Sequence, residues 1–122
     1  MNIMVVDDEQ DIQLLFKQQF RREIKQGIIK LYFALSAEEA LEYLQDNVSA
    51  HLVLILADIN MPGMNGLELL KIIKQRYPHL KVFIITAYGD EHNFRIAREY
   101  GADDYIEKPV IFDHLKEKIL KL

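Results

Sequence analysis

The chain has 122 residues, of which 50% are hydrophobic and 28% are charged, and it has a net charge of −4. These values are typical of a single globular domain, and we expect one domain over residues 1–122. No run of Lys and Arg supports binding to nucleic acid or to an anionic membrane, and no apolar run approaches the roughly 20 residues that span a bilayer. The chain has no cysteine, which excludes disulfides and thiolate chemistry and is compatible with the reducing cytoplasm, where we expect the protein.

Strand and helix patterns alternate along the chain. Short apolar runs predict strands over residues 3–6, 28–34, 52–57, 82–86 and 104–107. Apolar residues at helical spacing predict five helices: from Asp11 to a stop at Gly27, from a capping box at Ser36–Glu39, from Leu67 to Pro78, from Asp90 to a stop at Gly101, and from a cap at Asp113 to near Leu122.

The first, third and fourth strands are almost continuously apolar, as in a parallel sheet that is covered on both faces. Right-handed crossovers then predict an α/β fold with a doubly wound, five-stranded parallel sheet and five helices. In such sheets, ligands bind beyond the carboxyl ends of the strands.

Polar side chains follow four of the predicted strands at these carboxyl ends: Asp7 and Asp8, then Asp58 and Asn60, then Thr86, and finally Lys108. Carboxylates that gather at one edge repel one another unless a cation, a lysine or raised pKa values relieve the repulsion. Oxygen ligands without imidazole or thiolate suit a hard ion. The sequence therefore predicts a Mg²⁺ site beside a lysine at this edge.

The motifs at these strand ends resemble the receiver domain of two-component response regulators, and the match covers essentially the whole chain. They are VVDDE at 5–9, ADINMPGMNG at 57–66, ITA at 85–87 and YIEKP at 105–109. Each motif alone is weak, but all four in this order, each at a strand end, are specific. The chain is similar in length to the single-domain chemotaxis receiver, and the resemblance implies a flavodoxin-like fold.

The resemblance also implies a chemical role for each residue at this edge. Asp58 would accept a phosphoryl group from the phosphohistidine of a sensor histidine kinase or phosphotransfer protein, in keeping with carboxylates as nucleophiles. Asp8 and Asp58 would bind Mg²⁺ directly, Asp7 through water, and Asn60 through its backbone carbonyl. Lys108 would pair with Asp58 before transfer and with a phosphoryl oxygen afterwards.

The resemblance also implies a conformational switch and residues that control the lifetime of the phosphoryl group. Thr86 and the backbone N–H of Ala87 would contact phosphoryl oxygens, and Tyr105 would turn inward as Thr86 moves. This switch would change the surface formed by the helix over 90–100, the last strand and the last helix. Asn60 and Tyr88 lie two residues after Asp58 and Thr86 and would set the lifetime of the phosphoryl group, with Tyr88 shielding it from water. The Lys108–Pro109 peptide is expected to be cis, because X–Pro is the junction at which cis is cheap.

The helix over 90–100 also predicts a partner surface. Its stripe of Asn93, Ile96, Ala97 and Tyr100 should face the sheet. Phe94 lies roughly 110° from the centre of that stripe, so it should be partly exposed near Tyr105. We expect this pair to meet a downstream target, an output domain or a second copy in a phosphorylation-dependent homodimer. An isolated surface Phe is the alternative.

Other readings of the same residues stay open. A haloacid-dehalogenase-like phosphohydrolase also uses Asp, Thr, Lys and Mg²⁺, but its Asp-x-Asp follows the first strand, whereas this chain has Asp58-Ile59-Asn60 after the third. A degenerate receiver that acts as a protein-binding module would lack an acid, the Thr or the Lys, and none is missing. Asp7 and Asp8 could instead cap the next helix. We expect a phosphoacceptor signalling domain that catalyses its own phosphorylation and slow dephosphorylation, and not an enzyme with an external substrate.

Overall fold

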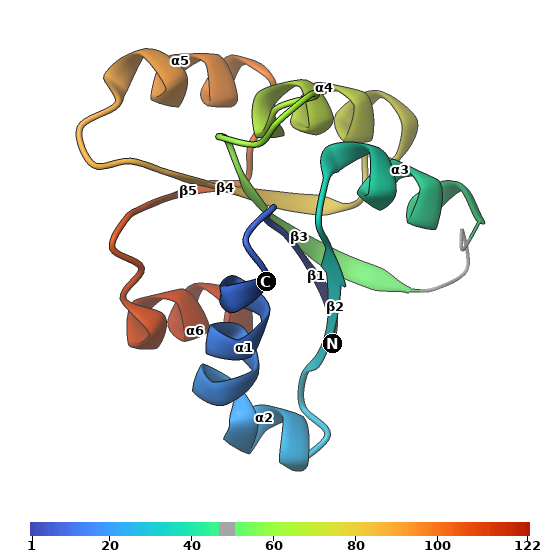
Figure 1. The fold of residues 1–122 in the computed structure, drawn as a ribbon, viewed down its shortest axis with the longest axis vertical. Helices are drawn as coiled ribbons and strands as arrows, with labels where there is room; N and C mark the ends of the chain where they lie inside the picture. Colours follow the sequence, from blue (N-terminus) through green and yellow to red (C-terminus); the bar gives the residue numbers. More distant parts are fainter. Residues whose placement is uncertain (47–50) are drawn as a thin grey trace.

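A computed structural model describes residues 1–46 and 51–122, and these residues form one five-stranded parallel sheet (Figure 1). The strands lie in the order β2-β1-β3-β4-β5. Their bounds are Asn2–Val6 for β1, Lys30–Ala34 for β2, Leu52–Asp58 for β3, Lys81–Thr86 for β4 and Asp104–Glu107 for β5. The predicted doubly wound parallel sheet is therefore confirmed.

Six helices cover the two faces of this sheet in the described residues. They are α1 (Gln10–Gln19), α2 (Arg21–Lys25), α3 (Ala37–Asp46), α4 (Gly66–Arg76), α5 (Glu91–Glu99) and α6 (Phe112–Leu120). Helices α3, α4 and α5 lie on one face, and α1, α2 and α6 lie on the other (Figure 1). Alternate residues of β1 supply the two cores, since Met4 and Val6 pack under α3 and α4 while Ile3 and Val5 pack under α1 and α6.

The prediction of a single helix from Asp11 to Gly27 was wrong, and the count of five helices was wrong with it. The chain bends at Phe20, whose φ of −100° and ψ of 12° separate α1 from α2. The Phe20 ring is fully buried and packs edge-to-face on Phe112 of α6, with 6.1 Å between the ring centroids. Burial of this ring therefore competes with regular helix geometry at this position. The bend leaves Ile24 38% exposed.

The cap of the last helix was also wrongly predicted. Helix α6 begins at Phe112 with Ile111 as its N-cap, so Asp113 lies in the first turn. A carboxylate there favours the positive end of the helix dipole without capping a backbone N–H. The Lys108–Pro109 peptide that precedes α6 is cis, as predicted.

The caps of α4 and α5 fix the loops that follow β3 and β4. Asn65 accepts hydrogen bonds from the backbone N–H groups of Leu67 and Glu68, and Asp90 accepts one from that of Asn93. Both helices thus begin at the carboxyl edge of the sheet. No helix in the described ranges is long and apolar enough to cross a membrane.

Candidate functional site

Asp58 lies at the centre of the predicted edge, as the last residue of β3. The residue is only 4% exposed, so its charge needs partners within the protein. Its Oδ2 accepts a hydrogen bond from Lys108 Nζ at 2.8 Å, and its Oδ1 accepts one from the backbone N–H of Asn60 at 3.2 Å. The predicted ion pair between Asp58 and Lys108 is therefore present, although the two residues lie far apart in the sequence.

Asp7 lies beside this pair, after the end of the neighbouring strand β1. Burial is the largest effect that raises the pKa of Asp7 to about 6, and the charge of Asp58 and a hydrogen bond with it add to the rise. The backbone N–H of Glu9, which donates to Asp7 Oδ1 at 2.9 Å, and the charge of Lys108 oppose this rise. Asp7 and Asp58 are thus two buried carboxylates near one lysine, and Asp7 stays protonated to a higher pH than an ordinary aspartate.

Lys108 follows β5 and reaches back across the end of β4. Burial of its ammonium opposes protonation, but the hydrogen bond and charge of Asp58, together with the charges of Asp7 and Glu9, raise its pKa. The backbone N–H of Lys108 donates to the carbonyl oxygen of Thr86 at 2.8 Å, which sets the position of the lysine along the sheet. Lys108 therefore stays protonated and available to an anion at neutral pH.

Thr86, at the end of β4, brings an unused hydroxyl to the edge. The residue is 1% exposed, and its Oγ1 has no hydrogen-bond partner within the part of the chain that the structure describes. Leaving a buried hydroxyl unpaired costs about 1–3 kcal/mol. Such a group is compatible with a site that receives an oxygen-rich ligand.

Tyr105 on β5 is held away from this edge by two contacts. Its hydroxyl donates to the carbonyl oxygen of Asp90 at 3.0 Å, and its ring packs edge-to-face on Phe94, with 4.6 Å between centroids. Burial raises the pKa of Tyr105, while the nearby hydroxyl of Thr86 acts in the opposite direction. Thr86 and Tyr105 are therefore close neighbours, as the predicted switch requires.

Gly66 is a structural element of the site that the sequence reasoning missed. It is the first residue of α4, and a Cβ at this position would collide with the carbonyl oxygen of Asp58 and lie 3.0 Å from the Cα of Ile59. Its backbone N–H donates to the carbonyl of Ile59 at 3.0 Å. The glycine after the Asn65 cap was the available signal, because a glycine at a helix start permits close backbone approach.

The carboxylates fit a metal ion that takes few protein ligands. No group of three or more His, Cys, Asp or Glu side chains is placed to hold a metal within residues 1–46 and 51–122. Asp8 and Asn60 are exposed, whereas Asp7 and Asp58 are buried next to each other. Mg²⁺ usually keeps several waters and binds through one or two carboxylates plus phosphate oxygens. Burial, with the charge of Asp58 adding to it, raises the pKa of Asp7, and two carboxylates buried next to each other fit such a cation.

The remaining predicted residues lie around this centre. Ala87 is exposed and Tyr88 is 84% exposed, so the Tyr88 ring packs against little of the protein. Tyr88, Phe94 and Tyr105 line one cavity of about 610 Å³. Phe94 is 40% exposed, as predicted, while Ala97 in the stripe toward the sheet is buried.

Residues 3–120 match the family model of the response regulator receiver domain. The chain belongs to this family. The receiver is 31% identical to sporulation initiation phosphotransferase F of Bacillus subtilis over 98% of this chain and 90% of that protein. It is 39% identical to the DNA-binding transcriptional regulator NtrC of Proteus hauseri over 92% of this chain, but it spans only 22% of that protein's length.

A solved CheY-like receiver domain from Methanospirillum hungatei has the same fold as this receiver, with a TM-score of 0.85 and 32% identity over 98% of this chain and 90% of that one. The receiver domain of NtrX from Brucella abortus is similar, with a TM-score of 0.83 and 33% identity over 98% and 95% of the two chains. The chain is thus a response regulator receiver domain of two-component signalling.

Proposed function

We propose that this receiver takes a phosphoryl group from the phosphohistidine of a sensor histidine kinase or phosphotransfer protein onto Asp58. In this step the N–P bond of a phosphohistidine whose other ring nitrogen is protonated breaks, an Asp58 carboxylate oxygen forms the new O–P bond, and the ring keeps that proton and leaves as neutral imidazole. The observation that carries the proposal is the buried Asp58 carboxylate, which is hydrogen-bonded to Lys108 at 2.8 Å and crowded by Asp7.

The groups around Asp58 match what phosphoryl transfer requires, which is positioning and neutralisation of charge. Lys108 holds the carboxylate before transfer and moves to a phosphoryl oxygen afterwards. The backbone N–H of Ala87, an exposed residue next to Thr86, would donate to another phosphoryl oxygen. The hydroxyl of Thr86, which has no partner among the described residues, donates to a second phosphoryl oxygen and thereby gains the hydrogen bond it lacks.

Asp7, Asp8, Asp58 and the backbone carbonyl of Asn60 would hold Mg²⁺ in this site, Asp7 through water. The ion would neutralise the charge on the carboxylates and on the incoming phosphoryl oxygens. Asp8 follows Asp7 in the sequence and is exposed, so its carboxylate would be accessible to a hydrated ion.

The switch follows from the position of Thr86 between Asp58 and Tyr105. Movement of Thr86 toward the phosphoryl group opens space beside it, and Tyr105 exchanges its hydrogen bond to Asp90 for an inward position. Because packed cores have discrete arrangements, a small shift at the site changes the surface of α5, β5 and α6. The Phe94–Tyr105 pair on this surface would then meet a target, an output domain or a second copy.

The relatives support two settings for this signal. One is named a phosphotransferase of nearly the same length, and another is a much longer DNA-binding regulator. We place the receiver in the cytoplasm, with a histidine kinase or phosphotransfer protein upstream and a protein target or output domain downstream. Nucleic acid and membrane are not proposed as direct partners.

The test is phosphorylation by acetyl phosphate with intact-mass detection. Mg²⁺ should allow one phosphoryl adduct per chain, and Asp58→Asn or excess EDTA should abolish it. Asp113→Asn is the matched control, because Asp113 is an exposed aspartate outside the site. An adduct that persists in Asp58→Asn would overturn the assignment. Continuous turnover of a phosphate monoester would instead favour the haloacid-dehalogenase-like reading.

A further inference from the structure

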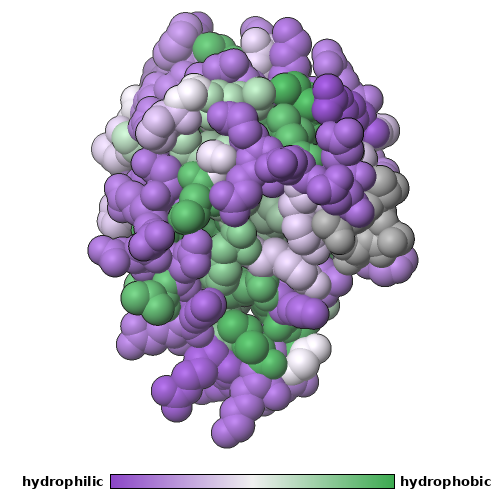
Figure 2. Space-filling view, turned by 45° about the vertical axis from the view of Figure 1, so that its right-hand side comes forward, coloured by the Kyte–Doolittle hydropathy of each residue, from purple (hydrophilic) through white to green (hydrophobic). Residues whose placement is uncertain are grey.

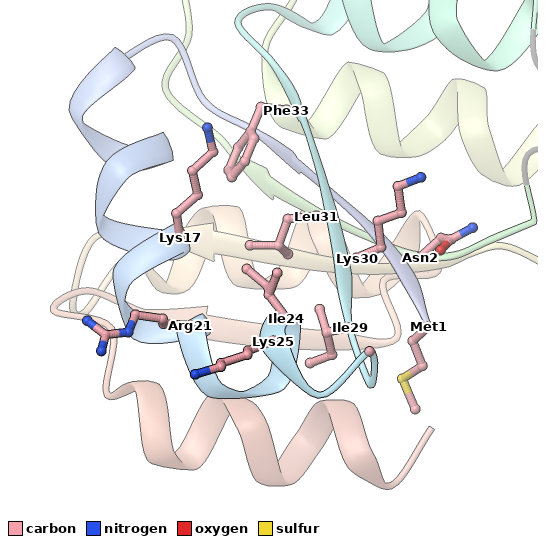
Figure 3. Close-up of a pocket in the computed structure, with 11 residues that line it drawn as sticks. Met1, Asn2, Lys17, Arg21, Ile24, Lys25, Ile29, Lys30, Leu31 and Phe33 are labelled. Atoms are coloured by element: carbon pink, nitrogen blue, oxygen red, sulfur yellow. The ribbon is translucent and has the colours of Figure 1, made fainter.

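A groove of about 720 Å³ lies at the end of the sheet where β1 and β2 begin (Figure 3), and Asp58 is not among its lining residues. Helices α1 and α2 form one side of it, and β2 with the start of β1 forms the other. Its lining includes five apolar side chains: Met1, Ile24, Ile29, Leu31 and Phe33. Helix α2 begins just after the bend at Phe20, and its Ile24 lines the groove and is 38% exposed.

Cationic groups surround this apolar lining. They are the side chains of Lys17, Arg21, Lys25 and Lys30, together with the amino group of Met1. No acidic residue lines the groove, and none of the four cationic side chains forms an ion pair with another described residue. The chain as a whole has a net charge of −4, so this concentration of positive charge is local. We call these residues the basic groove.

The basic groove has the composition of a surface that another molecule covers. Ile24 is 38% exposed, and the adjacent Ile28 is 42% exposed. Figure 2 shows hydrophobic atoms low on the molecule, in the region of α2 and the start of β2, with hydrophilic atoms around them. An exposed apolar area with a polar rim is typical of a binding site. Lys17 and Lys30 lie over the rings of Phe33 and Tyr32, but no acid in the lining offsets the positive charges, so an anionic ligand would stabilise them.

We propose that the basic groove binds an acidic peptide segment that lies extended along β2. Strand β2 is the edge of the sheet, and no strand pairs with its outer side within the described residues. An extended peptide can pair with such an edge and direct alternate side chains to the groove. Among the peptide side chains that face the groove, apolar ones then cover Leu31 and Phe33, and carboxylates reach the cations of α1 and α2.

The distribution of the cations favours a peptide over a small amphiphile. Lys17 comes from α1, and Arg21 and Lys25 come from α2, so the positive charges beside the apolar lining come from more than one element, while Lys30 points from β2 toward the other face of the sheet (Figure 3). A fatty acid carries one carboxylate at one end and would satisfy one part of this rim. A peptide whose groove-facing side chains include several acids carries separated carboxylates along its length. The groove does not include Asp58 or Lys108, and this proposal is independent of phosphoryl transfer.

The probe for this proposal is a fluorescein-labelled peptide of three Val-Ser-Glu-Ser repeats, in which Val and Glu share one face of an extended chain, with binding followed by fluorescence anisotropy. Wild-type protein should bind it saturably, and Lys17→Glu/Arg21→Glu should weaken binding by at least about tenfold. Arg76→Glu/Lys121→Glu is the matched control, because it changes the net charge equally at exposed positions outside the groove. The control should keep wild-type affinity to within about twofold.

A second pair of variants tests the apolar lining without changing charge. Ile24→Ser should weaken binding by about threefold or more, whereas Leu14→Ser, which alters a 68% exposed leucine outside the groove, should not. This pair also decides the matter if the charge-reversal variant fails to fold. Equal losses in groove and control variants, or no binding to wild type, would overturn the proposal. Displacement of the peptide by dodecanoate at equal concentration would assign the groove to a single-headed amphiphile instead.

Discussion

The two ends of the sheet carry opposite charge. At the carboxyl ends of the strands, Asp7, Asp8 and Asp58 gather around Lys108, and we call these residues the acidic edge. At the other end of β1 and β2, the basic groove gathers cations and no acid. The fold itself favours this division, because helices that follow parallel strands begin near the acidic edge and end near the opposite one. Helix dipoles stabilise acids near helix N-termini and cations near C-termini.

The difference between the two ends is that the central charge of the acidic edge forms an ion pair within the chain, whereas the side-chain cations of the basic groove form none with the described residues. Asp58 is buried, and its charge is met by Lys108 within the chain. The side chains of Lys17, Arg21, Lys25 and Lys30 are exposed and form no ion pair with described residues. A buried charge is destabilising unless a group of the same chain pairs with it, whereas an exposed charge can also pair with another molecule. The acidic edge therefore suits internal chemistry, and the basic groove suits recognition.

Removal of Lys108 should break the acidic edge most severely. Lys108→Ala should slow phosphorylation by acetyl phosphate by about a hundredfold, because the cation that positions Asp58 and meets the phosphoryl oxygens is lost. The rate is measured by intact mass at saturating Mg²⁺. Lys118→Ala is the matched control, since Lys118 also forms a 2.8 Å ion pair, with Asp104, and its side chain is 42% exposed against 44% for Lys108. Equal rates in the two variants would remove Lys108 from the transfer step.

Replacing one glycine at each end of the sheet by alanine distinguishes the energetic cost of a steric clash from the cost of backbone strain. Gly66→Ala should lower the free energy of unfolding by about 3 kcal/mol, because the added Cβ meets the Asp58 carbonyl. Gly27→Ala in the basic groove has nothing within 4 Å of the new atom and should cost about 1 kcal/mol through its φ of 73° alone. Urea denaturation measures both values. A smaller loss for Gly66→Ala than for Gly27→Ala would mean that the start of α4 can move away from Asp58.

The raised pKa of Asp7 should give the acidic edge its own pH dependence. The folded protein holds the Asp7 proton up to a pH of about 6, whereas the reference value for Asp is 3.8. Asp7 therefore contributes stability that is complete below pH 3.8 and is lost as the pH rises through 6. Without Mg²⁺, wild type should lose roughly 2 kcal/mol relative to Asp7→Asn between pH 4 and pH 7. Urea denaturation in EDTA at the two pH values measures this difference.

Saturating Mg²⁺ should remove most of that loss, because the ion stabilises the ionised carboxylates. A difference between wild type and Asp7→Asn that stays constant from pH 4 to pH 7 would show that Asp7 titrates in the folded protein as it does in the unfolded chain.

The acidic edge could be predicted from the sequence because the carboxyl ends of all strands in a parallel sheet lie at the same edge. Once Asp58, Thr86 and Lys108 are each placed at a strand end, the fold brings them to one edge, and the ion pair follows. The bend at Phe20 could not be predicted in this way, because it depends on the packing of that ring against Phe112 of α6. The contact of Gly66 with Asp58 and the basic groove also depend on how separate elements meet, and helical periodicity carries no information about that.

Tyr88 should have the smallest effect of these changes. It is 84% exposed and lines the cavity beside Phe94 and Tyr105, so little of the protein holds its ring in one place. A bulky side chain two residues after Thr86 can still move over the phosphoryl group once transfer has occurred. Tyr88→Ala should therefore speed the loss of the phosphoryl group only a few-fold, which corresponds to less than about 1 kcal/mol in the barrier.

The decay of the adduct is followed by intact mass after the phosphodonor is removed. Leu14→Ala is the control, because it truncates another strongly exposed side chain on α1, outside the cavity beside Phe94. An unchanged decay in Tyr88→Ala would mean that the ring stays in the exposed position and that water reaches Asp58 freely. A faster decay, with phosphorylation itself unaffected, would mean that the acidic edge recruits an exposed side chain to exclude water, while the basic groove keeps its exposed side chains for a partner.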